Sequence, residues 1–158
     1  MSYELIDNWA DYRLALDRLL NLAAESLCIY DEDLAALHLD SADHQIDLKR
    51  CLHGRHQNAL RIAVRNARIL RERCPALQDL LRTYGHIASA RETPPHLAHL
   101  RDSMVLADGR HALIRFERDL PRSKLLIDEP EQVLPYQRRF DEIWQEGGEM
   151  ITSTPLGL

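Results

Sequence analysis

The sequence predicts an α/β (α+β) domain in which helices cover a mixed β-sheet. Short apolar runs rich in branched residues intermix with amphipathic segments along the chain. An Asp-Gly pair between two apolar runs indicates a β-hairpin. The resulting order of elements, α-β-α-β-α-β-ββ-α, is typical of a mixed sheet with helices packed on it. The 158 residues fit one domain, and we find no internal repeat or linker that would divide them.

The first predicted helix covers residues 7–25. Apolar residues recur at three- and four-residue steps from Trp9 and Tyr12 onward, and Asp7 or Asn8 could cap the helix. A buried strand follows at residues 26–30 and is closed by the acidic run "DED". The next helix begins at Ser41 and ends near Gly54.

The middle of the chain predicts two more strands and a helix. Residues 59–66 are rich in branched side chains and read as a strand. Residues 67–85 are predicted to be helical in their second half, after Pro75, with Gly85 at the end. Residues 86–92 form a weak strand, and "TPPH" then breaks the chain.

The hairpin is the strongest local signal. "SMVLA" and "RHALIRF" flank Asp108-Gly109, and a type I′ turn needs positive φ at both central positions. Residues 119–132 are predicted to be mostly loop with a possible short strand. The last helix covers residues 131–148, with Pro135 within its first turns, and the tail after it is expected to be extended.

Bulk properties limit the environment and the partners. The net charge of −5 argues against nucleic acid as a partner, since dedicated binders are normally basic. Three widely spaced cysteines predict free, buried thiols in a reducing compartment. We see no signal peptide and no membrane span, so we expect a soluble, cytoplasmic protein. We find no Gly-rich phosphate loop or dinucleotide fingerprint, and we expect no cofactor.

Residues 60–145 carry the clearest resemblance to a known family. "DG" at residues 108–109, "DEP" at residues 128–130 and "FDEIW" at residues 140–144 follow one another in a familiar order. In this order the segment resembles one half of a phospholipase D-like fold. Members of that family carry His-x-Lys-x4-Asp on a strand, a second strand with Gly-Ser and Asn, and a late helix. The resemblance implies that residues 1–158 form a single phospholipase D-like half-domain.

The departures from the family motif are as informative as the matches. When the motif is aligned on Asp108, the nucleophilic His falls on Arg101 and the Lys on Ser103. The Gly-Ser pair then falls on Arg115 and Phe116, and the Asn falls on Arg118. When it is aligned on His99, Arg101 replaces the Lys, but the acid position becomes Leu106. Neither alignment preserves the catalytic set.

The missing residues matter because the family works by covalent catalysis at phosphorus. An arginine side chain stays protonated, so it cannot replace the attacking imidazole. The resemblance is therefore to a degenerate, non-catalytic half-domain, as in uncharacterised bacterial proteins with the same eroded motif. Family members bring two halves together, so we expect a homodimer or docking onto another protein domain.

Two site hypotheses follow from the resemblance. In the first, Arg101, Ser103, Arg115 and Arg118 form an anion-binding cleft for a phosphate-containing ligand, although nearby carboxylates could neutralise the arginines. In the second, an altered phosphodiesterase uses His99 or His111 as the nucleophile, Arg101 as the phosphate clamp and Asp108 as the retained acid.

Other polar clusters have plainer interpretations. The pairs His53/His56 and His96/His99 have metal-ligand spacing, but both fall in predicted helix ends or loops, and we expect no metal site. The arginines of residues 61–73 could contact phosphate, but we find no interleaved aromatics for base stacking and interpret them as a solvated face.

Overall fold

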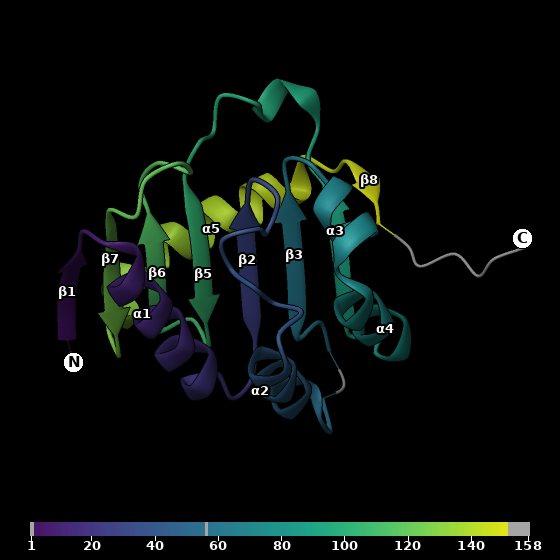
Figure 1. Cartoon of the computed structure of the whole chain (residues 1–158), viewed down its shortest axis with the longest axis horizontal. Coiled ribbons are helices and arrows are strands. Elements are labelled where there is room, and N and C mark those ends of the chain that lie inside the picture. The colour runs from purple at the N-terminus through teal and green to yellow at the C-terminus, as the bar shows by residue number, and fades with distance from the viewer. Residues whose placement is uncertain (1, 56, 152–158) are drawn as a thin grey trace, which may run out of the picture.

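The computed structural model describes residues 2–55 and 57–151 and shows a mixed β-sheet with helices on both faces (Figure 1). The sheet has eight strands in the order β1-β7-β6-β5-β2-β3-β4-β8. Helices α1 to α4 lie on one face of the sheet, and α5 crosses the other face (Figure 1). The predicted fold class is confirmed.

The strands are β1 (Ser2–Ile6), β2 (Leu27–Asp31), β3 (Leu60–Val64), β4 (Ala88–Glu92), β5 (Ser103–Ala107), β6 (His111–Arg115), β7 (Ser123–Ile127) and β8 (Glu149–Met150). The helices are α1 (Trp9–Leu22), α2 (Ala42–Leu52), α3 (Arg68–Arg73), α4 (Pro75–Thr83) and α5 (Pro130–Gln145), with a 3₁₀ turn at Pro95–Leu97.

Strand direction divides the sheet into two parts. Strands β2, β3 and β4 are parallel, whereas β5, β6, β7 and β1 are joined in antiparallel pairs. Because β5 is antiparallel to β2 and β6 is antiparallel to β5, β6 runs in the same direction as β2 (Figure 1). We call the edge where β2, β3, β4 and β6 end the carboxyl edge of the sheet.

The alternation of side chains along the strands builds two hydrophobic cores. Ile29 of β2 belongs to the larger core, under α1 to α4, together with Leu19 and Leu77. Its neighbour Tyr30 belongs to the smaller core, under α5, together with Phe140. A sheet buried on both faces explains why β2, β5 and β6 are apolar almost throughout.

Several local predictions are confirmed. Of the two candidate caps of α1, Asn8 is the one that accepts the Asp11 N–H, at 2.8 Å. Ser41 caps α2, and Gly54 adopts a φ of +73° just after that helix. Asp108 and Gly109 both have positive φ, as a type I′ turn requires. The connection is one residue longer than predicted, since β5 and β6 pair from Ala107 to His111.

Other elements were missed or incomplete in the sequence prediction. Strand β1 was not predicted, because its burial pattern lacks a regular alternation and it becomes a strand only by pairing with β7. Helix α3 was also missed, since only Leu70 is buried in it. The possible strand before the last helix is confirmed as β7. Of the tail predicted to be extended, residues 152–158 lie outside the described residues.

The described part of the chain contains no helix long and apolar enough to cross a bilayer. Cys28, Cys51 and Cys74 are free and buried, as predicted. Burial raises the pKa of the Cys51 thiol to about 11, and it also raises the pKa values of the other two thiols. The thiols are therefore protonated at neutral pH and are unsuited to nucleophilic chemistry.

Candidate functional site

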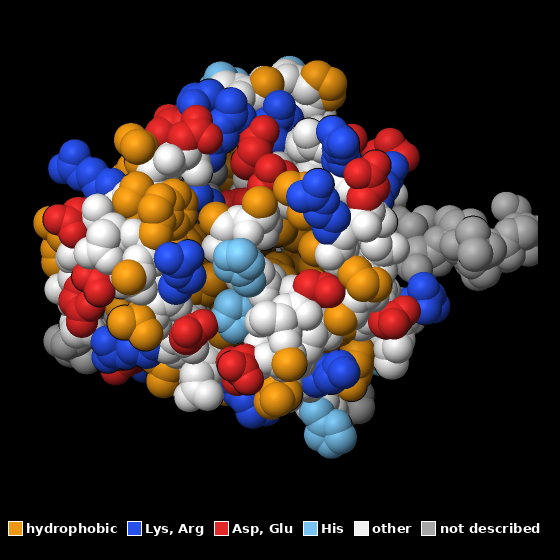
Figure 2. Space-filling model, viewed as in Figure 1, with side chains coloured by type: hydrophobic (Ala, Val, Ile, Leu, Met, Phe, Trp, Pro, Cys, Tyr) orange, Lys and Arg blue, Asp and Glu red, His pale blue; other side chains and the backbone are white. Residues whose placement is uncertain are grey.

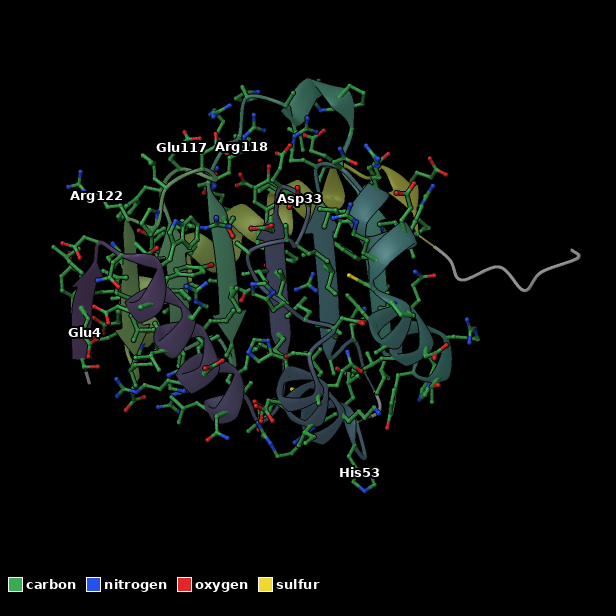
Figure 3. All side chains as sticks on the ribbon, in the orientation of Figure 1. Glu4, Asp33, His53, Glu117, Arg118 and Arg122 are labelled. Carbon is green, nitrogen blue, oxygen red and sulfur yellow. The ribbon has the colours of Figure 1, made fainter. Side chains whose placement is uncertain are left out.

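The largest hollow that we find among the described residues opens at the carboxyl edge. It has a volume of about 700 Å³ and lies where the chain leaves β2 and β6, next to the start of α1. We call it the carboxyl-edge cavity. It is lined by Trp9, Arg13, Asp31, Glu32, Asp33, Ala35, Ala36, His38, Arg115, Arg118 and Asp119. Figure 3 shows Asp33 above the end of β2, and Glu117 and Arg118 above β5 and β6.

A buried ion pair forms the floor of the cavity. Arg115 Nη2 at the end of β6 donates to Asp31 Oδ1 at the end of β2 over 2.6 Å, and the two side chains are 2% and 1% exposed. The other oxygen of Asp31 accepts the backbone N–H groups of Asp33 and Leu34. The pair therefore joins two neighbouring loops through one carboxylate.

The guanidinium of Arg115 has further contacts on the helix side. Nη1 donates to the carbonyl oxygen of Arg118 over 2.7 Å. The guanidinium carbon lies 5.4 Å from the ring centre of Trp9 and 5.2 Å from that of Tyr12. Burial raises the pKa of Tyr12 to about 12, although the Arg115 charge opposes this shift. The Tyr12 hydroxyl therefore stays protonated at neutral pH.

A second set of ion pairs forms the rim. Arg118 lies 2.7 Å from Glu32, and Arg101 is bonded to Glu117 at 2.5 Å and to Asp119 at 3.2 Å. The Arg101–Glu117 hydrogen bonds raise the pKa of the arginine and lower the pKa of the carboxyl. Acidic and basic side chains lie side by side along this edge in the space-filling view (Figure 2).

The four predicted anion-binding residues thus lie at the carboxyl edge. They do not form a cleft of unpaired positive charges. Arg101, Arg115 and Arg118 each face a carboxylate, which is the neutralisation that the sequence left open. Ser103 is 1% exposed and is not among the residues that line the cavity. A phosphate group would have to displace these carboxylates from the arginines, so anion binding here stays a prediction.

The residues of the alternative catalytic hypothesis lie at opposite edges of the sheet. His99 precedes β5, is exposed and faces the carbonyl oxygen of His96 at 3.2 Å. Asp108 follows β5, a strand about 16 Å long. His111, the other candidate nucleophile, is at the same far edge and accepts the Asp128 backbone N–H at Nδ1. The structure does not bring His99 and Asp108 together.

Asp108 has a structural explanation of its own. Its carboxylate accepts the backbone N–H groups of Ala24, Glu25 and Ser26, at 3.0, 2.8 and 3.0 Å. These donors belong to the loop between α1 and β2, so the acid ties the β5–β6 turn to that loop. These hydrogen bonds give Asp108 a structural role, and an acid at this position therefore needs no catalytic explanation.

Sequence reasoning missed much of the cavity lining. Trp9 was assigned to the core, and Arg13, Asp33 and His38 were not singled out. The available signal was the acidic run directly after a buried strand, because ligand sites of α/β sheets gather at the carboxyl ends of strands. Within residues 2–55 and 57–151, no three His, Cys, Asp or Glu side chains gather as a metal site. His56, of the first His pair, is outside the described residues.

Comparison with solved structures shows the fold. TrmBL2, an archaeal chromatin protein with a novel mode of DNA binding, matches with a TM-score of 0.70 and 14% identity over 94% of this chain and 54% of its own. The chain thus spans about half of TrmBL2. Nuc from Salmonella typhimurium, a phospholipase D family member, matches with a TM-score of 0.62 and 13% identity over 96% of this chain and 99% of its own.

NucT from Helicobacter pylori matches with a TM-score of 0.55 and 11% identity over 96% of this chain and 99% of its own. At these identities the likeness concerns the fold alone, and it supports the phospholipase D-like architecture that the sequence suggested. No curated protein matches the sequence. The model of one family matches residues 8–152, which is most of the chain. The chain therefore belongs to the DUF7931 family, a domain of unknown function.

Proposed function

We propose that this domain is a non-catalytic binding module with a phospholipase D-like fold, whose ligand enters the carboxyl-edge cavity. One observation carries the proposal. When the family motif is aligned on Asp108, Arg101 takes the position of the nucleophilic histidine, and in the structure it is engaged by Glu117 and Asp119. A permanently protonated side chain in an ion pair cannot attack phosphorus.

The surroundings of Arg101 support the same conclusion. In the same alignment Ser103 takes the position of the family's lysine, and it is buried and carries no charge to stabilise a phosphoryl oxygen. The buried carboxylate of Asp31 is used by Arg115 and by two backbone N–H groups, so it is not available as a general base. What remains is a hollow of the size that small ligands occupy.

Two kinds of partner belong to the proposal. Nuc and NucT match over 99% of their own chains, so this half-domain has their extent, and we expect it to self-associate or to dock onto another protein domain. TrmBL2 is described as binding DNA, so nucleic acid stays a candidate partner here despite the net charge of −5. The carboxylates at the carboxyl edge still oppose a polyanion at that place.

An activity assay separates this proposal from the altered phosphodiesterase. The protein and its His99→Ala and His111→Ala variants are incubated with bis(4-nitrophenyl) phosphate, and a commercial phosphodiesterase serves as the positive control. We expect all three proteins to give the background rate. Hydrolysis by the unmodified protein that disappears in His99→Ala or His111→Ala would overturn the proposal and establish the altered enzyme.

Thermal unfolding with a panel of phosphate compounds tests the anion-binding hypothesis at fixed ionic strength. The panel contains inorganic phosphate, nucleotides, phospholipid head groups and short oligonucleotides. A ligand at 100 times its Kd adds about 2.7 kcal/mol of stability, which is a clear shift of Tm. A Tm shift with a phosphate compound that is lost in Arg101→Ala or Arg118→Ala would indicate that the phosphate binds at the rim. An oligonucleotide shift that both variants retain would place nucleic acid elsewhere on the surface.

A further inference from the structure

The carboxyl-edge cavity keeps one negative and one positive side chain outside its ion pairs. Four carboxylates and three arginines line it. The floor and rim pairs use Asp31, Glu32 and Asp119 together with Arg115 and Arg118. Asp33 and Arg13 are left. Among the described residues Asp33 accepts only the backbone N–H of Ala35, at 2.9 Å, and Arg13 has no ion pair or hydrogen bond.

The floor of the cavity is closed by a buried guanidinium. Arg115 lines the cavity but is only 2% exposed, and its Nε is closed off from the surface. The charged groups left for a ligand are therefore the guanidinium of Arg13 as a donor and the carboxylate of Asp33 as an acceptor.

The apolar part of the lining comes from Trp9, Ala35 and Ala36. Trp9 is half-buried, since it packs edge-on against Tyr12 with ring centres 5.6 Å apart and contacts the larger core. An indole fixed in this way gives a short carbon chain an apolar surface without ordering a new side chain. A pocket of mixed apolar lining and few placed polar groups is the usual form of a small-molecule site.

From these features we propose that the cavity binds a short zwitterion, a molecule whose ammonium and carboxylate groups are separated by a carbon chain. The ammonium group is bound by Asp33, and the carboxylate is bound by Arg13. A simple cation would leave Arg13 without a partner, and a polyanion would meet the carboxylates. This inference rests on the proposed function, because it assigns the ligand class of the same cavity.

Isothermal titration with a matched set of probes tests the charge requirement. The probes are 6-aminohexanoate, hexanoate and hexylamine, which share a chain length and differ only in their charged ends. We expect 6-aminohexanoate to bind at least about tenfold more tightly than either singly charged probe. Homologues from 4-aminobutyrate to 8-aminooctanoate then give the best separation of the two charges.

Two variants test which residue binds each charged end of 6-aminohexanoate. Asp33→Asn keeps an oxygen for the Ala35 N–H, and it should weaken 6-aminohexanoate about tenfold while leaving hexanoate unchanged. Arg13→Gln should weaken 6-aminohexanoate similarly while leaving hexylamine unchanged. Glu142→Gln and Arg73→Gln, at exposed positions on α5 and α3, are the matched controls and should bind like the unmodified protein.

The outcomes separate this inference from the proposed function. Absence of binding by every zwitterion up to about 10 mM, or equal affinity for all three six-carbon probes, overturns the ligand class. The phosphodiesterase assay is independent of these probes. A protein without hydrolysis and without zwitterion binding therefore loses the inference but remains a binding module, whereas hydrolysis that depends on His99 or His111 removes the module itself.

Discussion

At the scale of single residues, Arg115 and Asp31 decide the shape of the carboxyl edge. They are 84 positions apart in the sequence and come from strands that are not neighbours, since β5 lies between β6 and β2. The pair holds the loop after β2, through Asp33 and Leu34, against the loop after β6, through Arg118. Both charges are out of contact with water, so each depends on the other.

We predict that Arg115→Ala destabilises the protein by about 3–5 kcal/mol, because it leaves the Asp31 carboxylate buried without its partner. Urea denaturation followed by circular dichroism measures the loss. Arg118→Ala is the control, since its pair with Glu32 is 28% and 27% exposed and should contribute less than about 1 kcal/mol. Equal losses of unfolding free energy in the two variants would contradict a dominant role for the buried Arg115–Asp31 pair.

The sequence could not reveal this pair, although it named Arg115. A resemblance to a motif placed Arg101, Ser103, Arg115 and Arg118 together, and they do share the carboxyl edge. Their partners could not be predicted, because the choice between a ligand anion and a protein carboxylate depends on which loops meet in space. The acids that engage them come from the loops after β2 and β6.

At the scale of elements, the junction between β7 and α5 is held by the start of β6. His111 Nδ1 accepts the Asp128 N–H at 2.9 Å, and the Arg110 carbonyl accepts the Glu129 N–H, also at 2.9 Å. Asp128 has a φ of +56°, a left-handed conformation that these bonds help to hold. An imidazole that accepts a hydrogen bond at Nδ1 must be neutral, and burial lowers the pKa of His111.

We predict that this junction weakens in mild acid. Because the pKa of His111 is lower in the folded state, the unfolded chain binds the proton first. The contribution of neutral His111 to the free energy of unfolding is complete above about pH 6.5. It is lost as the pH falls from there towards the lowered pKa that His111 has in the folded state. His111→Gln should therefore lose less stability than the unmodified protein between about pH 7.5 and about pH 5 in urea denaturation.

The control for this prediction is His53→Gln, which removes an exposed histidine at the end of α2. It should keep the pH dependence of the unmodified protein. If His111→Gln also keeps it, then His111 titrates alike in the folded and unfolded states and the junction is not sensitive to pH.

Elements with local signals were predicted well, and elements without them were not. The caps at Asn8 and Ser41 and the turn at Asp108-Gly109 depend on residues within a few positions of one another. Strand β1 depends on β7, more than a hundred residues away, and its own sequence is mixed. Helix α3 ends at Arg73, two residues before Pro75, and one buried leucine gave too little periodicity to detect it.

At the scale of the whole molecule, the surface shows where a second copy could dock. The aromatics Trp9, Tyr12, Phe140 and Trp144 pack in or against the two cores. The aromatics that remain exposed are Tyr3 at 52% and Phe116 at 44% among the described residues. Phe116 begins the β6–β7 loop at the carboxyl edge, and Leu120 of the same loop is 54% exposed.

We predict that the protein is a dimer in which this loop contacts the partner, because Phe116 and Leu120 expose apolar side chains on the loop whose Arg118 and Asp119 line the cavity. Burial of a phenylalanine contributes about 1.5–3 kcal/mol, so Phe116→Ser should raise the dimer Kd at least tenfold, since about 1.4 kcal/mol is a factor of ten. Size-exclusion chromatography with light scattering over a concentration series measures this. Tyr3→Ser, on the edge strand β1, is the matched control and should leave the dimer intact. A monomer at about 100 μM unmodified protein would contradict self-association, and a dimer lost in Tyr3→Ser alone would move the interface to β1.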